Sequence, residues 1–500
     1  MLHVRVIKTK GDSKSVQGYH YRKGKRVIFK HIGSGSTEQQ ITILLEMAKV
    51  FIADHTKQIY LFDEQQPNEQ DVLLSQCTYL GSYYTFLYDI LRAIQHHIGY
   101  PLLTDTLLND LTLIRIIEPA SKLRSIRLLR TYFGIDHRHQ RYYESAPKWL
   151  ELKQTVEKQT LKFAKAVYSF DFSMVFYDVT TLYFESFTSD DLRKTGFSKD
   201  GKAQQPQILV GLLVTPEGFP VGYHVFSGNT FEGHTIIPVV QDFIKKHKVK
   251  LFTVVADAAM ISNDNIQALK QEAIHYIVGA RLGNLSSDML TQIDNALKRE
   301  DGKNIRLETD KGFLICSFSK KRYNKDKHEM DKQIDKAKNL MRQPSKIKKV
   351  TFIKTDNSKA SLNEELITKT KMLLGVKGYY TDMTANIIDH ATIIKNYHEL
   401  YRVEQAFRGS KNDLKTRPIF HFKSHTIQLH ILICFMALVV SKHIEIKTGV
   451  SIREFITQAK KITDARLMNQ INKREVTMRV TVTKEIRKII AKLNLIPNLQ

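Results

Sequence analysis

The sequence predicts an α/β protein in which a mixed sheet is flanked by helices and lies between helical N- and C-terminal regions. The stretch FSMVFYDVTTLYFES is almost unbrokenly apolar up to Asp178, which is typical of a strand covered on both faces. Two β-rich runs within residues 205–226 are joined by the turn TPEGFP, which indicates an antiparallel pair. Helical and strand-like segments then alternate, so the predicted order is strand, hairpin, helix, strand, helix, strand.

The elements after the hairpin follow from their periodicity and end signals. Amphipathic spacing predicts a helix in HTIIPVVQDFIKKHKV, and an apolar strand follows in KLFTVVADAAM, ending at Asp257. Capping residues open the next helix, SNDNIQALKQEA, and HYIVGAR is a further strand. Residues 282–385 interrupt this pattern with a long charged, helix-forming stretch, so we interpret them as an insertion. The helix that closes the domain is predicted at residues 384–414.

The region before the sheet is predicted to be basic and mostly helical. Apolar and basic residues alternate around Gly24 in YHYRKGKRVIFKHIGSGS, which predicts a short β-hairpin followed by a helix over residues 37–55. Residues 101–134 predict two helices broken at Pro119. The second helix presents one basic stripe, formed by Arg124, Arg127 and Arg130, opposite an apolar stripe, formed by Leu123, Ile126 and Leu129. This basic stripe is either a DNA contact or an ordinary solvated face.

The charge of the chain favours a polyanionic partner. Lys and Arg outnumber Asp and Glu by 76 to 51, which gives a net charge of +25. Such a field favours nucleic acid first and an anionic membrane second, and the alternative is a merely basic soluble protein. The basic residues are concentrated in three separate segments, 1–40, 320–354 and 441–500. This distribution suits a long DNA duplex better than a small acidic ligand.

Several classes of protein are not indicated by the sequence. The start of the chain lacks the apolar segment of a signal peptide. The longest apolar run, ILICFMALVV, is about half of the roughly 20 residues that a membrane helix requires, so it is predicted to be a buried core helix. Cys77, Cys316 and Cys434 are widely separated, which indicates neither a disulfide framework nor a zinc site. We therefore expect a cytosolic protein that does not act at a membrane.

Two carboxylates at strand ends indicate a metal site for phosphoryl transfer. Strands hold Asp178 and Asp257 rigidly, and their predicted ends place both at a cleft. Such hard oxygen ligands suit Mg²⁺ or Mn²⁺, and two such ions would activate the attacking oxygen and stabilise the leaving one. A glutamate from a helix crossing the cleft would complete the ligand set, and Glu404 is the candidate.

The helix that carries Glu404 supports this assignment through its spacing. Tyr397, Glu404 and Lys411 are seven residues apart and are therefore predicted to share one stripe. The adjoining buried stripe is predicted to contain Leu400, Val403, Phe407 and Leu414. We expect Lys411 to hold a flanking phosphate. The alternative is that Glu404 simply pairs with Arg408 one turn away.

Together these features resemble the DDE transposases of bacterial insertion sequences. The resemblance is to the branch that has a β-rich insertion before the catalytic glutamate and a signature of Tyr, Arg, Glu and Lys around it. Tyr397, Glu404 and Lys411 are in register with this signature, whereas Leu400 stands at its Arg position. Arg402 and Arg408 are the nearest substitutes.

Four further motifs carry the resemblance over roughly residues 100–440. FYDVTT and VVADAAM are similar to the two Asp motifs, and RIIEPASKL and RPIFHF are also similar to family motifs. The resemblance implies an RNase H-like core, Mg²⁺ bound by Asp178, Asp257 and Glu404, and catalysis by the same three residues. It also implies cleavage and transfer of DNA strands at the terminal inverted repeats of the protein's own element. The implied partner is double-stranded DNA, both transposon ends and target, contacted by Tyr397, Arg408 and Lys411 and bound by a homodimer.

Two alternative functions are open from the sequence. DVTT after a buried strand is similar to the nucleophile loop of doubly wound phosphatases, although the hairpin and the absence of a second Asp two residues later argue against it. A basic DNA-binding repressor, or an inactivated transposase, would leave the carboxylates structural.

We expect six regions along the chain. They are a basic β-hairpin and helix (1–60), a helical DNA-binding region (61–165), the first part of the core (166–281), the insertion (282–385), the closing helices with the catalytic Glu (386–440) and a basic helical C-terminal region (441–500).

Overall fold

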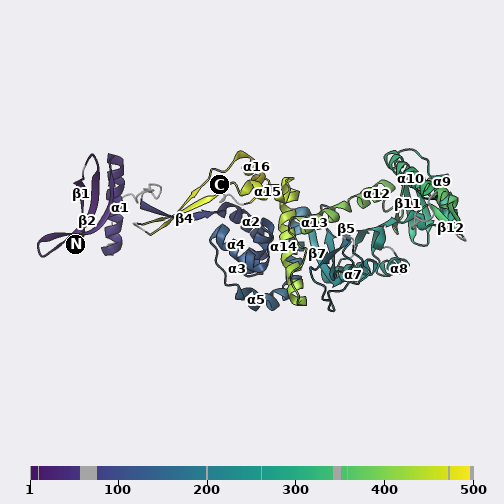
Figure 1. Ribbon diagram of the computed structural model, residues 1–500, viewed down its shortest axis with the longest axis horizontal. Coiled ribbons are helices and arrows are strands. Elements are labelled where there is room, and N and C mark those ends of the chain that lie inside the picture. Colours follow the sequence, from purple (N-terminus) through teal and green to yellow (C-terminus); the bar gives the residue numbers. More distant parts are fainter. Residues whose placement is uncertain are drawn as a thin grey trace.

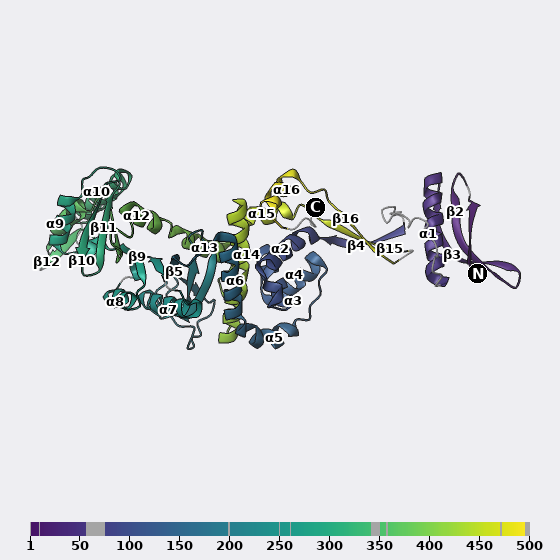
Figure 2. The ribbon, with the colours of Figure 1, turned by 180° about the vertical axis from the view of Figure 1, so that it is seen from behind.

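The computed structural model describes residues 2–9, 11–56, 76–198, 201–249, 251–260, 262–341, 351–356, 359–470 and 473–495. The molecule is elongated, and its parts follow one another along the long axis (Figure 1). A small N-terminal unit lies at one end, a helical region lies in the middle, and the main sheet extends toward the other end. The helix α14 stands between the helical region and the main sheet, as Figure 2 shows from behind.

The main sheet has eight strands in the order β10-β11-β14-β9-β8-β5-β6-β7. The central strand β5 pairs in parallel with β8, and β8 pairs in parallel with β9, whereas the other pairs are antiparallel. This arrangement confirms the predicted mixed sheet and the predicted antiparallel hairpin. The strands are β5 (Met174–Tyr183), β6 (Gln207–Val214), β7 (Pro220–Ser227), β8 (Thr253–Ala256), β9 (His275–Ala280), β10 (Asn304–Thr309), β11 (Gly312–Phe318) and β14 (Val376–Thr381).

One predicted strand end is wrong, because β5 does not end at Asp178. The strand continues five residues further to Tyr183, and every one of these residues pairs with β6. The β-branched residues that follow the aspartate favour this extension. By contrast, β8 stops at Ala256, directly before Asp257, and the short helix η4 (Ala258–Met260) begins at once.

Helices cover both faces of the main sheet. Tyr177 of β5 donates a hydrogen bond of 2.8 Å to Thr235, directly before α7 (Ile236–His247), so this side of β5 faces that helix. On the opposite side, Thr180 and Leu182 line a small cavity with residues of α13 and α14. The helices α7 and α8 (Asn263–Gln271) lie together below the sheet in Figure 1.

Residues 282–385 extend the main sheet and also form a small core of their own. Their strands β10, β11 and β14 continue the sheet from β9. Around them are the helices α9 (Ser287–Ala296), α10 (Lys320–Met341) and α11 (Glu364–Met372) and the hairpin of β12 (Ile353–Asp356) and β13 (Lys359–Leu362). The separate core consists of Met330, Ala337, Phe352, Ile367 and Leu374.

The single closing helix predicted over residues 384–414 is wrong, because the segment forms two helices. They are α12 (His390–His398) and α13 (Tyr401–Asn412). At the junction the backbone tightens: the N–H of Leu400 donates to Tyr397 and that of Val403 to Leu400, both three residues back. Tyr397 is therefore on α12, whereas Glu404 is on α13.

The predicted helical region packs around α14 (Ser424–Thr448). The break at Pro119 is confirmed, because it falls between α3 and α4, and side chains of Asp105 and Ser121 cap the two helices. The helices are α2 (Thr85–Ile98), α3 (Thr106–Ile117), α4 (Lys122–Phe133), α5 (Gln140–Glu151) and α6 (Lys153–Tyr168). By length and composition α14 would suffice to cross a membrane, but 94% of its most apolar window is buried inside the protein. The prediction of a core helix is confirmed.

The C-terminal region, predicted to be basic and helical, contains strands as well as helices. Besides α15 (Ile452–Ala459) and α16 (Lys484–Ala491), the region contains the strands β15 (Asp464–Asn469) and β16 (Glu475–Arg479). They form a three-stranded sheet with β4 (Cys77–Tyr83), in a region that was predicted to be helical. Asp464 is fully buried and accepts two hydrogen bonds from Arg479, at 2.8 and 2.9 Å, which join the two strands of the hairpin.

The N-terminal unit is a three-stranded sheet with one helix packed against it. The predicted hairpin around Gly24 is confirmed as β2 (Lys14–Arg22) and β3 (Lys25–Gly35), and β1 (Leu2–Lys8) adds a strand that was not predicted. The predicted helix is α1 (Glu38–Thr56). The core between sheet and helix is separate from the main core and contains Val16, Ile32, Ile41, Leu44 and Ala48.

The C-terminal sheet depends on the buried carboxylate of Asp464. Asp464→Ala should lower the local stability of β15 by about 1.5–3 kcal/mol, because it removes two hydrogen bonds between charged groups. Native-state hydrogen exchange at the amides of β15 measures this quantity. As the control, Glu365→Ala breaks an ion pair of 2.9 Å whose carboxylate is 78% exposed, so it should leave the hydrogen exchange of the β15 amides unchanged. Equal effects of the two variants would contradict the prediction.

Candidate active site

Asp178 and Asp257 occupy neighbouring positions on adjacent parallel strands. The register between β5 and β8 pairs Phe176 with Val255 and Tyr177 with Ala256. The next residue of each strand is an aspartate, so the two acids follow each other in register across the sheet. Side chains in register on parallel strands point to the same face. The sheet therefore presents two carboxylates side by side, one half-buried within β5 and one exposed just after β8.

Asp257 is oriented by two hydrogen bonds. Its carboxylate accepts from the backbone N–H of Ala258 at 2.7 Å and from the hydroxyl of Tyr397 at 3.3 Å. The tyrosine lies across β9, where Gly279 makes room for it: a Cβ at that glycine would stand 2.4 Å from the tyrosine oxygen. Burial raises the pKa of Tyr397, and the charges of Asp257 and Glu404 raise it further, so the hydroxyl keeps its proton and donates.

Glu404 lies on α13, which crosses the face of β5 that carries the first aspartate. Near the start of this helix, Arg402 donates to the carbonyl of Glu217 at 3.3 Å, in the β6–β7 turn beside the start of β5. Two turns later, Lys411 lines a small cavity with Thr180, toward the end of β5. Glu404 lies between these two points and is exposed. The helix thus brings a third carboxylate to the level of the aspartate on β5.

The apolar stripe predicted for this segment is confirmed. Leu400, Val403, Phe407 and Leu414 are all buried, with at most 7% of any of them exposed. The predicted shared stripe of Tyr397, Glu404 and Lys411 is wrong, because the junction between α12 and α13 separates Tyr397 from the other two. Among the described residues, no ion pair joins Glu404 to Arg408. The simple pairing that was the alternative role for Glu404 is therefore absent from the part of the chain described.

The oxygen ligands suit a hard divalent cation, although they do not form a closed cage. Within the described ranges, no three His, Cys, Asp or Glu side chains are close enough together to hold one metal ion. The neighbouring positions of Asp178 and Asp257 nevertheless fit a cation that takes few protein carboxylates and keeps other positions for water and phosphate. Glu404 supplies the same type of donor from the helix above them.

Lys377 is a residue of this site that the sequence analysis missed. It lies on β14, with its ammonium 4.8 Å from the ring centre of Tyr397. Burial and the charge of Arg322 lower the pKa of Lys377, whereas the charges of Asp257 and Glu404 act in the opposite direction. The lysine thus shares its electrostatic surroundings with two of the three acids. Its signal in the sequence was a single charged residue within the otherwise uncharged strand VKGYYT.

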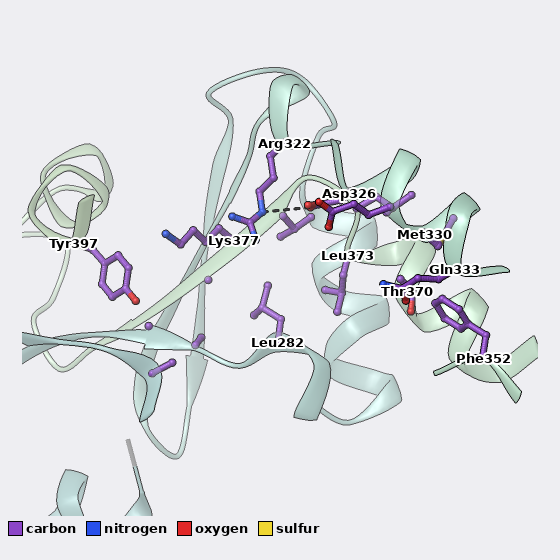
Figure 3. Close-up of a pocket in the computed structure, with 17 residues that line it drawn as sticks. Leu282, Arg322, Asp326, Met330, Gln333, Phe352, Thr370, Leu373, Lys377 and Tyr397 are labelled. Carbon is purple, nitrogen blue, oxygen red and sulfur yellow. Dashed lines mark ion pairs between the residues drawn. The ribbon is translucent and has the colours of Figure 1, made fainter. Parts of the chain in front are cut away.

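A cavity of about 440 Å³ opens beside the site, between the main sheet and α10. Figure 3 shows Tyr397 and Lys377 on one side of it, and Arg322 and Asp326 of α10 on another. Arg322 pairs with Asp326 at 3.3 Å. Ala258, directly after Asp257, also lines the cavity. Residues from the segment 282–385 therefore line one cavity together with Ala258 and Tyr397, which are neighbours of Asp257.

The other predicted DNA-contacting residues do not line the cavity beside Tyr397 and Lys377. Arg408 lines a different cavity, of about 410 Å³, with residues of α14. The stripe on α4 is exposed at all three arginines, but Arg124 pairs with Glu118 at 2.9 Å. Opposite the stripe, Ile126 and Leu129 are buried as expected, whereas Leu123 is 45% exposed.

The two other motifs that carry the resemblance, RIIEPASKL and RPIFHF, contact α14 and the end of β5. In RIIEPASKL, Lys122 is buried, and its Nζ lies 3.5 Å from Nδ1 of His430 on α14. In RPIFHF, the N–H of Ile419 donates to the carbonyl of Tyr183, the last residue of β5, at 3.2 Å. The position equivalent to the signature arginine is the buried Leu400, and Arg402 is paired with Glu399 instead.

Comparison with known proteins gives a match to a family model. A family model described as "Transposase DDE domain" matches residues 170–440, which includes all three acids. A comparison with curated proteins gives no match. Among solved structures, the chain is similar to a piggyBac transposase in a synaptic complex with hairpin DNA, with 10% identity, 90% of this chain and 77% of that chain covered, and a TM-score of 0.34. Because the family model covers more than half of the chain, the protein belongs to the family of transposases with a DDE domain.

Proposed function

We propose that the protein binds the terminal inverted repeats of its own insertion sequence and catalyses metal-dependent cleavage and transfer of DNA strands. The observation that carries this proposal is the register of β5 and β8, which aligns Asp178 with Asp257 beneath the helix of Glu404. The family match over the same residues supports it. The proposed core is RNase H-like, with residues 282–385 inserted before the closing helices.

In this proposal Asp178, Asp257 and Glu404 hold Mg²⁺, or Mn²⁺, at two neighbouring positions. A bound divalent cation would lower the pKa of an attacking water or hydroxyl and stabilise the leaving oxygen. Tyr397 keeps Asp257 in one orientation by donating to its carboxylate. Lys377 offsets part of the charge of Asp257 and Glu404, which reduces the repulsion between carboxylates at adjacent positions.

The residues around the acids are suited to position DNA. Lys411 is seven residues beyond Glu404 on α13, about 10 Å along the helix axis, which is a suitable distance for a phosphate flanking the reacting one. Arg322 is the cation of α10 beside the cavity next to the site. The strongly basic chain would bind both transposon ends and target as duplex DNA, and a homodimer would bring two ends together.

The alternative of a doubly wound phosphohydrolase loses its support. Such enzymes carry their nucleophile in a loop after a strand of a parallel sheet, whereas Asp178 is within β5 and pairs with Leu212 of an antiparallel strand. The second candidate is a protein that binds DNA without catalysis, because exposed basic residues would suit such a protein equally well. The experiments below separate it from the catalytic proposal.

Glu404→Gln separates chemistry from binding. The substitution keeps the shape and helix propensity of the side chain and removes the charge that a hard cation needs. Cleavage of duplex DNA carrying the ends of the element should fall by orders of magnitude in Mg²⁺, while binding of the same DNA stays close to that of the unaltered protein. The matched control is Glu454→Gln, on the exposed face of α15, which should leave both quantities unchanged. A fully active Glu404→Gln protein would exclude Glu404 from catalysis.

Metal binding is measurable without cleavage. Asp178→Asn and Asp257→Asn should each weaken Mn²⁺ binding, measured by isothermal titration calorimetry, by at least about 10-fold, because loss of even an outer-shell partner costs that much. Asp288→Asn, at an exposed position of α9, is the control and should bind Mn²⁺ like the unaltered protein. Unchanged Mn²⁺ affinity in both site variants would show that the two aspartates do not bind the cation.

The basic stripe on α4 is expected to contact phosphates. Arg127→Gln combined with Arg130→Gln should reduce the slope of log affinity against log salt by roughly 2, about one unit for each lost phosphate contact. Arg124→Gln should have less effect, because Glu118 already neutralises part of that charge. The control removes two charges from α6, with Lys158→Gln and Lys162→Gln. Identical slopes for the stripe variant and the unaltered protein would show that this stripe faces away from DNA.

A further inference from the structure

The N-terminal sheet has one face packed against α1 and one face without a covering element in the described chain. Val16 and Ile32 point to the helix and form the small core with Leu44. Because side chains alternate along strands, the neighbouring positions point the other way. We call this side the outer face and define it by His3, Arg5, Gln17, Tyr19, Tyr21 and Arg26. It lies outside the residues matched by the family model.

The side chains of the outer face hold one another in place. Arg5 donates twice to the side-chain oxygen of Gln17, at 3.0 and 3.3 Å, and its guanidinium lies 5.8 Å from the ring centre of Tyr19. Arg26 donates to the hydroxyl of Tyr21 at 3.0 Å and lies 5.6 Å from the ring centre of Tyr19. Two guanidinium groups are thus fixed on a rigid strand surface. Fixing long side chains in advance reduces the entropy that binding would otherwise cost.

Cations flank the outer face at both ends of the sheet, and one acid, Asp12, lies in the turn between Lys8 and Lys14. The β2–β3 turn has positive φ at Lys23 and Gly24, as a type I′ hairpin requires, and it presents Arg22 and Lys25 to solvent. Lys8 pairs in register with Lys14 at the opposite end, about 27 Å away along β2 by the rise of a strand. None of the strand residues that form the outer face is an Asp or a Glu. Residues 1–40 carry nine Lys or Arg against two acids.

We propose that the outer face enters the major groove of duplex DNA and reads the edges of the bases there. The major groove is about 12 Å wide and admits a β-ribbon. Arg pairs with guanine and Gln with adenine through paired hydrogen bonds, and the centre of the outer face offers both types of side chain. The lysines and the arginine at the two ends of the sheet contact phosphates, which set the position of the sheet on the duplex. This inference rests on the proposed function in one respect only: the ends of the element are taken as the DNA that the outer face binds naturally.

The chemistry of the outer face favours duplex DNA over RNA. The major groove of double-stranded RNA is too deep and narrow for side chains to read. Single-stranded RNA is recognised by stacking of bases on open aromatic rings. The rings of Tyr19 and Tyr21 meet edge to face at 5.7 Å, and guanidinium groups lie over them, so they offer no open platform.

The test uses the full-length protein and a library of random-sequence DNA duplexes of about three helical turns. Repeated selection and sequencing should enrich one motif with the unaltered protein. Arg5→Lys and Arg26→Lys keep the charge but remove the paired donors of guanidinium. Each should weaken binding of the enriched duplex by roughly 5- to 150-fold, the range for one paired base contact. Binding of a shuffled duplex should change by less than about 3-fold, because the phosphate contacts remain.

The matched control is Lys49→Ala, at an exposed position of α1 on the opposite side of the sheet. It should weaken the enriched and the shuffled duplex equally. The inference is overturned if no motif is enriched, if both Arg→Lys variants keep the same ratio between enriched and shuffled duplex, or if an RNA copy of the motif binds more tightly than the DNA. Tight binding of the shuffled duplex by the variants shows that they are folded.

The same proteins separate this inference from the proposed function. If the unaltered protein selects a motif that depends on Arg5 and Arg26 but does not cut DNA containing it, the catalytic proposal fails and the inference stands. If the unaltered protein cuts DNA, and both Arg→Lys variants cut it at the same sites, the inference fails and the catalytic proposal stands.

Discussion

The parallel pairing of β5 with β8 is the constraint on which the candidate active site depends. Residues 79 positions apart in the chain are brought into register by it, so the alignment of Asp178 with Asp257 follows from backbone hydrogen bonds and not from contacts between the acids. The antiparallel hairpin β6–β7 and the helix α7 must therefore fit between the two strands in the chain. Covering one face with α7 leaves the acid-bearing face for α13, which packs on β5 through Val403 and Phe407.

Because of the break between α12 and α13, Glu404 and Tyr397 point in different directions. On one continuous helix, Tyr397 and Glu404 would point the same way. With the junction at Glu399 and Leu400, Tyr397 points across β9 to Asp257, while Glu404 is carried over β5. The buried Leu400 anchors the junction in the core. A buried apolar residue therefore stands where the related signature has an arginine. Lys377, from β14, supplies a cation whose pKa is affected by the charges of Asp257 and Glu404.

The sequence was sufficient for features that depend on local periodicity. Strands of the main sheet, the break at Pro119, the buried stripe on α13 and the core helix α14 all follow from spacing and end signals. Features that depend on pairing between segments were missed: β15 pairs with β4 almost 400 residues away, and β16 pairs with β15. In the same way, β5 extends past Asp178 because β6 pairs with it. Lys377 was missed for the same reason, since only the sheet order places β14 beside β9 and thus near Asp257.

The fold separates the parts suited to recognition from the part suited to chemistry. The three acids lie within residues 170–440, two of them on the main sheet. A shift of one residue in the register between β5 and β8 would place the two aspartates on opposite faces of the sheet. The arginines of α4 and of the outer face lie outside that range, and the outer face is on a unit whose small core is separate from the main core. If the outer face reads DNA as proposed, surface substitutions there would change which DNA is bound without disturbing the register of β5 and β8. A transposase whose element acquires new ends would then have to change residues such as Arg5, Gln17 and Arg26, while the sheet keeps the two aspartates aligned.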